Sequence, residues 1–346
     1  MSQGRLVLED CDITSETGAC IAIEGRETHP IIRRCAIHDG NDCGIYIGDH
    51  GQGLIENCRI DNHTRACIVI CKQADPLIRR CEIVDGKEGG IYIFEQGRGT
   101  IEGCTISGHT QAGLAIGSGS HPTVRQCQIH SGKAAGVYAW RGGLGHIEDC
   151  AIFDNAMAGV LIVEESNPTL LQCQIRNGQQ SGISVLDHGI GLFEGCLIFG
   201  NATAGINISQ GGNPILRQCR IYDGNNVGIH VYEHGAGMLE DCDIVGNAST
   251  GVRIRQGGNP TLRRCQIHNG KQDGIVVTEE GAGFIEDCDI AGNLLSGIDI
   301  NRAGNPTIRQ CRIHDHNEHH GLFVHTQGEG LIEECTIMVT PWQTSP

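Results

Sequence analysis

The sequence predicts an all-β solenoid of about fourteen coils, with three short strands in each coil. Three observations support this fold class: a regular cysteine series, short apolar segments of period two, and glycine-rich punctuation between them. Fifteen of the 19 cysteines stand 23 residues apart, with 24 at the first and last steps. The series is Cys11, Cys35, Cys58, Cys81, Cys104, Cys127, Cys150, Cys173, Cys196, Cys219, Cys242, Cys265, Cys288, Cys311 and Cys335.

Each 23-residue unit contains three segments whose apolar side chains recur at every second position. Around Cys58, for example, they are Ile55, Ile60, Ile68 and Ile70. Period two is typical of β-strands, and the glycine-rich breaks disfavour helix. We therefore expect equal positions of successive coils to stack in parallel sheets about 4.8 Å apart. The core would then consist of ladders of isoleucine and cysteine.

The residue five positions after each series cysteine is expected to form a corner. From Cys35 to Cys311 it is glycine, histidine or asparagine, as at Gly40, His63 and Asn155. These residue types tolerate left-handed backbone better than others. We therefore expect a positive φ at this position in each coil.

The true repeat spans two coils, because two further positions alternate. Proline and glycine alternate five residues before the cysteine, as at Pro30 and Gly53. Glutamate and arginine alternate two residues before it, and Leu171 is the one break in this row. Stacking would place each arginine between two glutamates and would penalise a slip by one coil. Each exposed pair contributes only about 0–1 kcal/mol.

The composition excludes some partners and leaves one domain. The formal net charge of −16 would repel nucleic acid, whose binders need a basic surface. There is no apolar run of the ~18 residues that a membrane span requires, and no apolar signal core at the N-terminus. We therefore expect a cytoplasmic protein without membrane contact. Residues 1–338 are predicted to form a single β-helix domain, followed by a short tail at 339–346.

Two phrases carry a resemblance to known repeats: NPTLRRCQIHNGKQDGIVV (259–277) and GHIEDCAIFDNAMAGVLI (145–162). They resemble the right-handed parallel β-helix repeats of F-box-only ubiquitin-ligase substrate receptors and of related bacterial β-helix proteins. The resemblance spans residues 5–338, with one systematic departure: cysteine stands where the family usually has an inward asparagine. The resemblance implies protein recognition. The broader repeat class also contains sugar hydrolases, lyases and epimerases, so polysaccharide chemistry is implied as well.

A predicted binding face combines aromatic residues with a mostly acidic border. The aromatic residues stand at outward positions eleven or thirteen residues after the cysteine, mainly in alternate coils, with charged residues just beyond them. Exposed aromatic rows typically mark contact surfaces, although β-propensity on a half-solvated sheet also explains them. The predicted face comprises Tyr46, Tyr92, Phe94, Tyr138, Trp140, Tyr232, Glu95, Arg141, Asp187, Glu233 and Glu279.

No catalytic residue is assigned from the sequence. Glu233 and Glu279 have a spacing that suits glycoside hydrolysis, but many pairs in an acidic row share it. Two places offer candidate metal ligands, and packing or solvated turns explain both more simply. We therefore expect no metal and no cofactor. The candidate metal ligands at the two places are Cys20, Cys43, Cys67, Cys71, His314, His316, His319 and His320.

The favoured hypothesis is a non-catalytic repeat scaffold that recognises a protein partner along the aromatic-acidic face. One alternative is a polysaccharide-binding β-helix protein, or an enzyme that cleaves polysaccharide as a lyase or glycoside hydrolase. A second alternative is a structural rod that assembles end to end. The sequence leaves all three open, because the repeat specifies the fold far more closely than the function.

Overall fold

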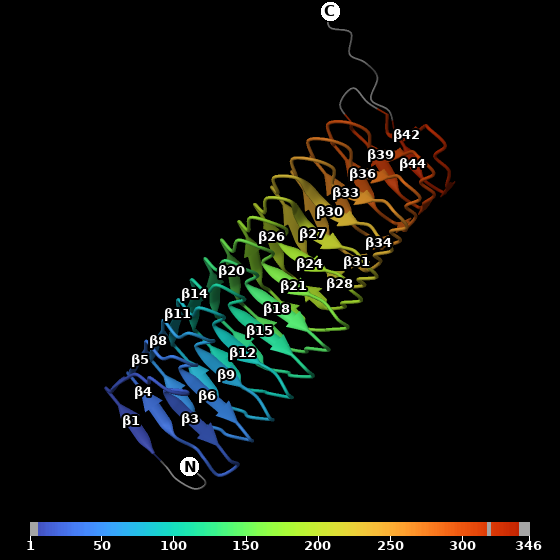
Figure 1. The fold of residues 1–346 in the computed structure, drawn as a ribbon. Coiled ribbons are helices and arrows are strands. Elements are labelled where there is room, and N and C mark those ends of the chain that lie inside the picture. Colours follow the sequence, from blue (N-terminus) through green and yellow to red (C-terminus); the bar gives the residue numbers. More distant parts are fainter. Residues whose placement is uncertain (1–5, 317–319, 339–346) are drawn as a thin grey trace, which may run out of the picture. The chain divides into compact units, whose positions relative to one another are not determined.

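A computed structural model describes residues 6–316 and 320–338 of the chain. These residues form β-strands and turns and contain no helix, so none of them provides a helix that could cross a membrane. Two compact units, Met1–Gln179 and Gln180–Pro346, are described in turn. Within each unit, successive coils add one strand to each of three parallel sheets (Figure 1). The predicted all-β solenoid with three strands per coil is confirmed.

In the first unit, each sheet grows by every third strand along the chain. Sheet 1 contains β1 (Val7–Glu9), β4 (Ile31–Arg33), β7 (Leu54–Glu56), β10 (Leu77–Arg79), β13 (Thr100–Glu102), β16 (Thr123–Arg125), β19 (His146–Glu148) and β22 (Thr169–Leu171). Sheet 2 contains β2 (Asp12–Ile13), β5 (Ala36–His38), β8 (Arg59–Asp61), β11 (Glu82–Val84), β14 (Thr105–Ser107), β17 (Gln128–His130), β20 (Ala151–Phe153) and β23 (Gln174–Arg176). Sheet 3 contains β3 (Ile21–Glu24), β6 (Ile45–Gly48), β9 (Ile68–Ile70), β12 (Ile91–Ile93), β15 (Leu114–Gly117), β18 (Val137–Trp140) and β21 (Val160–Ile162).

The second unit repeats the arrangement. Its part of sheet 1 contains β25 (Leu192–Glu194), β28 (Ile215–Arg217), β31 (Met238–Glu240), β34 (Thr261–Arg263), β37 (Phe284–Glu286), β40 (Thr307–Arg309) and β43 (Leu331–Glu333). Its part of sheet 2 contains β26 (Leu197–Phe199), β29 (Arg220–Tyr222), β32 (Asp243–Val245), β35 (Gln266–His268), β38 (Asp289–Ala291), β41 (Arg312–His314) and β44 (Thr336–Ile337). Its part of sheet 3 contains β24 (Ile183–Val185), β27 (Ala204–Ile208), β30 (Val227–Val231), β33 (Val252–Ile254), β36 (Ile275–Val277), β39 (Ile298–Ile300) and β42 (Leu322–Val324).

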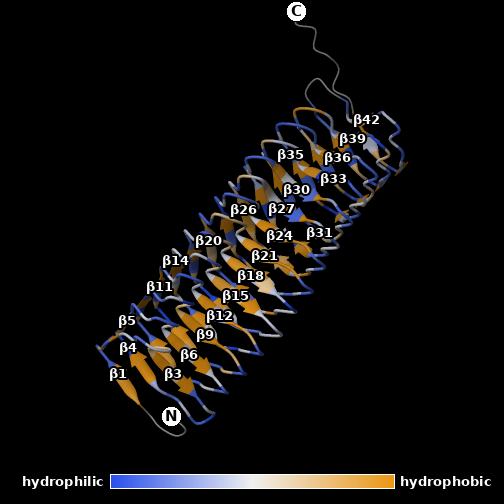
Figure 2. Ribbon diagram, viewed as in Figure 1, coloured by the Kyte–Doolittle hydropathy of each residue, from blue (hydrophilic) through white to orange (hydrophobic). Residues whose placement is uncertain are grey.

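The register of the strands shows that 23 residues make one coil. Ile55 pairs with Ile78 in sheet 1, and Ile60 pairs with Ile83 in sheet 2. All four of these side chains are fully buried. Figure 2 shows the strands in mainly hydrophobic colours and the turns between them in mainly hydrophilic ones. The inward ladders therefore form the core, as the period-two pattern predicts.

The series cysteines form a buried ladder of free thiols. Cys127 is 1% exposed, and its Sγ donates to the carbonyls of Arg125 at 3.3 Å and Ile101 at 3.7 Å. Each coil repeats this arrangement, so the thiol satisfies backbone acceptors at a corner. A thiol in this role behaves as a small apolar side chain with a weak donor.

The predicted left-handed corner is misplaced by one residue. Positive φ occurs four residues after the cysteine, at Asp39 (54°) and Asn62 (56°), and not five residues after it. The next residue instead turns a polar side chain inward. Oδ1 of Asn155 accepts from the N–H of Gly132 at 3.0 Å, and its Nδ2 donates to the carbonyl of Ile129 at 3.2 Å. Histidine and asparagine recur here because buried backbone groups need partners, not because of their φ preference.

The alternating Glu–Arg row is present on sheet 1. Arg125 contacts Glu102 at 3.3 Å, and Arg263 contacts Glu286 at 3.1 Å. Leu171 stands opposite Glu148, where the row is interrupted. Opposite charges thus meet only in the correct register, which supports the predicted penalty for a slip.

Candidate functional site

The outward tyrosines of sheet 3 in the first unit stand in every second strand. Tyr46, Tyr92 and Tyr138 lie at the centres of β6, β12 and β18, and each is half-buried. The intervening strands present the smaller Val69 and Ala115 to the same face. Neighbouring tyrosines are therefore about 9–10 Å apart, two strand spacings. Large and small side chains alternate, so the face is hollowed between the rings.

Trp140 differs from the prediction, because it is buried and not exposed. Its side chain is only 9% exposed, and its indole lies over Gly117 of the preceding strand. Its ring centroid is 5.4 Å from that of Tyr138 and 5.0 Å from that of Tyr92. The ring of Phe94 lies 5.6 Å from Tyr92. Trp140 thus joins two tyrosines that the sequence places on separate rungs, and the four rings form one cluster.

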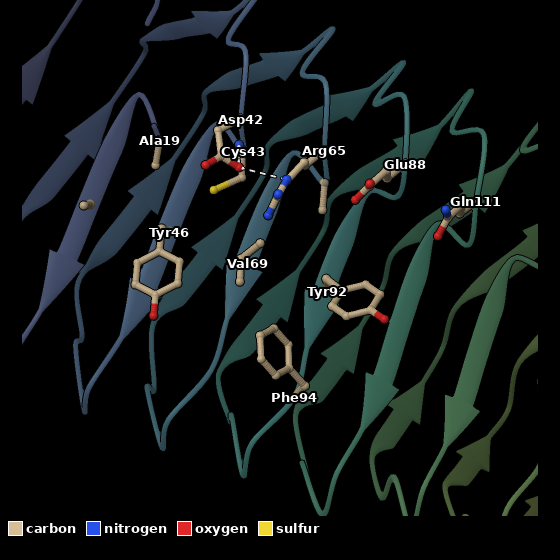
Figure 3. Close-up of a pocket in the computed structure, with 12 residues that line it drawn as sticks. Ala19, Asp42, Cys43, Tyr46, Arg65, Val69, Glu88, Tyr92, Phe94 and Gln111 are labelled. Carbon is tan, nitrogen blue, oxygen red and sulfur yellow. Dashed lines mark hydrogen bonds and ion pairs between the residues drawn. The ribbon is translucent and has the colours of Figure 1, made fainter. Parts of the chain in front are cut away.

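A hollow of about 700 Å³ lies along this face between Tyr46 and Tyr92. Figure 3 shows its two sides: Tyr46, Tyr92 and Phe94 line one, and the polar residues line the other. Arg65 contacts Asp42 at 3.4 Å on the polar side. The polar side consists of Asp42, Arg65, Glu88 and Gln111 from successive coils. The hollow therefore offers ring faces along one edge and hydrogen-bonding groups along the other.

A second, more apolar hollow of about 230 Å³ follows on the other side of Tyr92. Ala115 forms part of its floor, and Tyr138, Leu161 and Met157 line it as well. Met157 is 40% exposed, so part of this apolar lining faces solvent. Tyr92 stands between the two hollows and belongs to both.

The four additional cysteines do not gather into a metal site in the part of the chain that the structure describes. Cys43 lines the larger hollow, where burial and nearby Asp42 raise the pKa of its thiol to about 11. Burial raises the pKa of Cys67 to about 12. Sγ of Cys71 donates to the hydroxyl of Tyr46 at 3.3 Å. Neutral thiols are poor nucleophiles. Cys43 and Cys71 pack against the face, whereas Sγ of Cys67 donates to the carbonyl of Val84 at 3.6 Å.

The predicted border of the first unit consists of turn residues. Glu95 and Arg141 are exposed and have positive φ values of 51° and 49°. Nε of Arg141 lies 3.6 Å from a carboxylate oxygen of Glu164. The two residues lie at equivalent corners after sheet 3, where the backbone requirement is the same in each coil.

In the second unit, the predicted residues do not form a matching aromatic face. Asp187 and Glu233 are exposed at corners with positive φ. Tyr232 is half-buried and stacks on His230, with ring centroids 4.5 Å apart. The carboxylate of Glu279 contacts Arg255 and Arg302, each at 3.5 Å. Glu279 is therefore held between two cations.

The sequence analysis missed a polar hollow of about 520 Å³ in the second unit. Its lining includes Arg253, Asp299, Asn301 and His325 from sheet 3 and the turn after it. The repeat carries a signal, because Arg253 and Asp299 stand at the outward position that is tyrosine, valine, alanine or leucine throughout the first unit. Charged residues at this outward position, and not aromatic residues alone, therefore mark the hollow.

The family of the repeat follows from matches that together span nearly the whole chain. The family described as a right-handed β-helix region matches residues 2–124, 78–221 and 204–341. The chain belongs to this family. The finer resemblance to F-box-only receptors stays a hypothesis.

Solved structures with a similar fold include enzymes that act on polysaccharides. The A-module of the Azotobacter vinelandii mannuronan C-5 epimerase AlgE4 has a TM-score of 0.59 and 13% identity, covering 91% of this chain and 89% of that one. The periplasmic alginate epimerase AlgG has a TM-score of 0.58 and 12% identity, covering 85% and 77%. At these identities the likeness establishes the fold.

The histidines near the end of this right-handed β-helix do not converge. His314 lies between Asp289 at 3.0 Å and Asp315 at 2.6 Å. His316 is buried, and His320 stacks on Phe323 with ring centroids 5.2 Å apart. His319 lies outside the described residues. Among residues 6–316 and 320–338, no three candidate ligands come together as a metal would require.

Sheet 2 of the β-helix carries aromatic pairs that the sequence analysis also missed. Phe153 stacks on His130 in the first unit, with ring centroids 4.5 Å apart, and Arg176 covers its ring at 4.3 Å. In the second unit Phe199 stacks on Tyr222 at 4.8 Å. These rings are occupied by one another and by arginine, so they are less available to a ligand than the tyrosines of sheet 3.

Proposed function

We propose that sheet 3 of the first unit binds an extended, uncharged polysaccharide. The observation that carries this proposal is the row of Tyr46, Tyr92 and Tyr138 at intervals of two coils, with a hollow on each side of Tyr92. Polysaccharide epimerases with a similar fold support this choice over the protein-partner hypothesis.

The spacing and shape of the face suit a sugar chain. Pyranose rings present C–H groups that pack on aromatic faces, and their hydroxyl edges require hydrogen bonds. The interval of about 9–10 Å between tyrosines is close to two units of an extended pyranose chain. Asp42, Glu88 and Gln111 supply polar groups along the opposite edge of the larger hollow. The rings are already ordered by packing, which limits the entropy lost on binding.

The charge of the groove favours an uncharged chain over a polyuronate. Two carboxylates, Asp42 and Glu88, line the larger hollow, and the one arginine of its lining, Arg65, contacts Asp42. The whole chain carries a formal net charge of −16. An anionic polysaccharide would therefore be repelled at this hollow.

A protein partner remains the second hypothesis, and the burial of Trp140 weakens it. Protein interfaces gain most of their affinity from large side chains that insert into the partner. Trp140, the largest aromatic residue of the face, is 9% exposed and is committed to its own cluster. Hollows flanked by half-buried rings suit a narrow ligand better than a broad surface.

Affinity electrophoresis tests the proposal with soluble hydroxyethylcellulose, xylan and glucomannan, and with alginate and polygalacturonate as charged counterparts. We expect Tyr92-dependent retention by at least one uncharged polysaccharide, and no Tyr92-dependent retention by the two anionic ones. Tyr92→Ala should lower the affinity by about tenfold, as loss of one stacked aromatic contact does. The matched control is Tyr222→Ala, which removes a stacked ring on sheet 2.

Three results would separate the alternatives. Absence of retention on every uncharged polysaccharide, or retention on alginate that Tyr92→Ala lowers, would overturn the proposal. An increase in reducing ends or in unsaturated products during incubation would show an enzyme. Loss of binding in Tyr222→Ala as well as Tyr92→Ala would indicate a general folding defect, which thermal unfolding of both variants detects.

A further inference from the structure

The polar hollow of the second unit has an excess of positive charge in a strongly acidic chain. Its lining contains three guanidinium groups, from Arg253, Arg255 and Arg302, and two carboxylates, from Glu279 and Asp299. Glu279 contacts both Arg255 and Arg302 at 3.5 Å. One carboxylate is thus shared by two arginines, which leaves the third without a matching charge.

Arg253 is the cation without a carboxylate partner. It stands outward between His230 and Val276 on neighbouring strands. Its Nη2 donates to the hydroxyl of Thr250 at 3.3 Å, and among the described residues it takes part in no ion pair. Partial burial and the nearby charge of Arg255 lower the pKa of Arg253. A half-buried guanidinium retains several donors that a ligand can use.

The other charged groups around Arg253 are already engaged. Asp299 accepts from Nδ2 of Asn301 at 2.7 Å, and Nε2 of His325 lies 3.3 Å from the same oxygen. Asp273, a further acidic neighbour of Arg253, accepts from the backbone N–H of Ser296 at 3.0 Å. None of these acids is within ion-pair distance of Arg253 in the described structure.

The rest of the lining suits a hydroxylated ligand. The hydroxyl of Thr278 donates to Oδ1 of Asn301 at 2.6 Å, which turns the Asn301 amide toward Asp299. Asp299, Asn301, Thr278 and Thr326 all line the hollow beside His325. They provide both hydrogen-bond donors and acceptors close to the free guanidinium.

We propose that this hollow binds a carboxylate carried by a polyhydroxylated ligand, with Arg253 receiving the carboxylate through its planar guanidinium. The chemistry is that of a sugar acid, free or as one unit of a longer glycan. This site is independent of the uncharged-polysaccharide face, since it lies in the other unit and uses different residues. Guanidinium groups bind carboxylates in a forked geometry that lysine cannot reproduce.

Calorimetric titration tests the site with glucuronate, its methyl ester and glucose as a matched series. We expect glucuronate to bind, and the ester and glucose to bind at least tenfold more weakly, because a charged hydrogen bond is lost. A glucuronate-containing oligosaccharide distinguishes the two sources: tighter binding of the oligosaccharide than of the monosaccharide indicates a unit of a glycan. Higher salt should weaken glucuronate binding.

Two variants are expected to change the affinity for glucuronate in opposite directions, and a general folding defect could not raise it. Arg253→Gln should abolish the preference for glucuronate over glucose, and Arg253→Lys should restore it only in part. Glu279→Gln frees two guanidinium groups and should strengthen glucuronate binding several-fold. Arg217→Gln on sheet 1 is the control. Arg217 lies 3.3 Å from Glu240, and its replacement should leave the affinity for glucuronate unchanged.

The proposal would be overturned by equal binding of glucuronate and its ester, or by unchanged glucuronate binding in Arg253→Gln. Weaker binding in Glu279→Gln would also contradict it. Tyr92→Ala in the first unit should leave the glucuronate titration unchanged, so failure of either site is recognised separately.

Discussion

The backbone N–H of Gly86 donates a hydrogen bond to Nδ1 of His109 at 3.0 Å. On the other side of the ring, Nε2 of His109 donates to the carbonyl of Ile83 at 3.0 Å. Asn155 uses its amide oxygen and nitrogen in the same way two coils later. Because one ring nitrogen must accept and the other must donate, this arrangement requires a neutral imidazole with its proton on Nε2.

The first prediction is that His109 makes the protein sensitive to mild acid. Burial lowers the pKa of His109 to about 4. Protonation therefore favours the unfolded chain, in which histidine has a pKa near 6.5. The stabilisation is complete above pH 6.5 and is lost as the pH falls toward 4, by about 2 kcal/mol at pH 5.

Urea unfolding at pH 7.5 and pH 5 measures this effect. His109→Asn should shift the midpoint less between the two pH values than the parent protein does, because the amide does not titrate. His188→Asn, at an exposed corner, serves as the control and should retain the parental pH dependence. Equal pH dependence in His109→Asn and the parent would show that His109 is not the responsible group.

The second prediction concerns the contact between Gly117 and Trp140. A Cβ atom at position 117 would lie 2.3 Å from Cε2 of the indole, closer than any packed pair allows. Gly117→Ala should therefore displace Trp140 and destabilise the fold by about 1–3 kcal/mol. In a Trp342→Phe background, the fluorescence of Trp140 should shift to longer wavelength as its ring becomes more exposed.

Gly145→Ala is the matched control for this prediction. The added methyl group would come within 3.0 Å only of the flexible end of Ile116. We expect a smaller loss of stability and unchanged Trp140 emission. If Gly117→Ala left the emission unchanged, the buried position of Trp140 would be contradicted. The affinity of the Gly117→Ala variant for the polysaccharide should also fall, as in Tyr92→Ala, because Tyr92 packs on the indole of Trp140.

The third prediction is that Glu56 contributes more to the free energy of unfolding than the other glutamates of the Glu–Arg row. Its side chain is nearly buried and contacts Arg33 at 3.3 Å, Arg79 at 2.7 Å and also Arg80. Arg79 and Arg80 hold the pKa of Glu56 below its usual value. Its stabilisation is therefore present above the normal glutamate pKa and is lost as the pH falls through the lowered one.

Comparison of Glu56→Gln with Glu102→Gln checks this prediction by urea unfolding at pH 7. Glu102 is more exposed and has one arginine partner, Arg125, at 3.3 Å. We expect a clearly lower midpoint for Glu56→Gln and little change for Glu102→Gln. Similar midpoints for the two variants would mean that the additional arginine contacts of Glu56 do not stabilise the fold.

The ladders of the fold were predictable from sequence because the same constraint is repeated in every coil. Cys58, Ile60 and their equivalents recur at 23-residue steps, and each position must face the core. A repeated pattern averages out local ambiguity in strand assignment. The one error in the turns, at His63 and its equivalents, arose because asparagine and histidine serve two roles that composition does not separate: left-handed backbone and side-chain capping.

The candidate sites were less predictable because they depend on single departures from the repeat. Trp140 was expected to be exposed, but the absence of a side chain at Gly117 lets its indole pack down over the neighbouring strand. The hollow around Arg253 depends on one arginine that has no carboxylate partner among the described residues, although its guanidinium donates to Thr250. Sequence spacing identifies the face on which such residues lie but not which charges remain unpaired.

The last prediction concerns the reactivity of the 19 free thiols. Cys11, Cys20 and Cys335 are partly exposed, whereas the other sixteen are buried. Thiolates are the reactive form, and burial raises the pKa of Cys67 to about 12 and, together with Asp42, that of Cys43 to about 11. Iodoacetamide under native conditions should therefore modify the three partly exposed residues alone, as measured by mass spectrometry of peptides. Modification of all nineteen in urea provides the control.

Rapid native labelling of Cys43 would show that the larger hollow opens more deeply than its packed wall allows. Protection of Cys43 by a polysaccharide would then locate the ligand beside Tyr46.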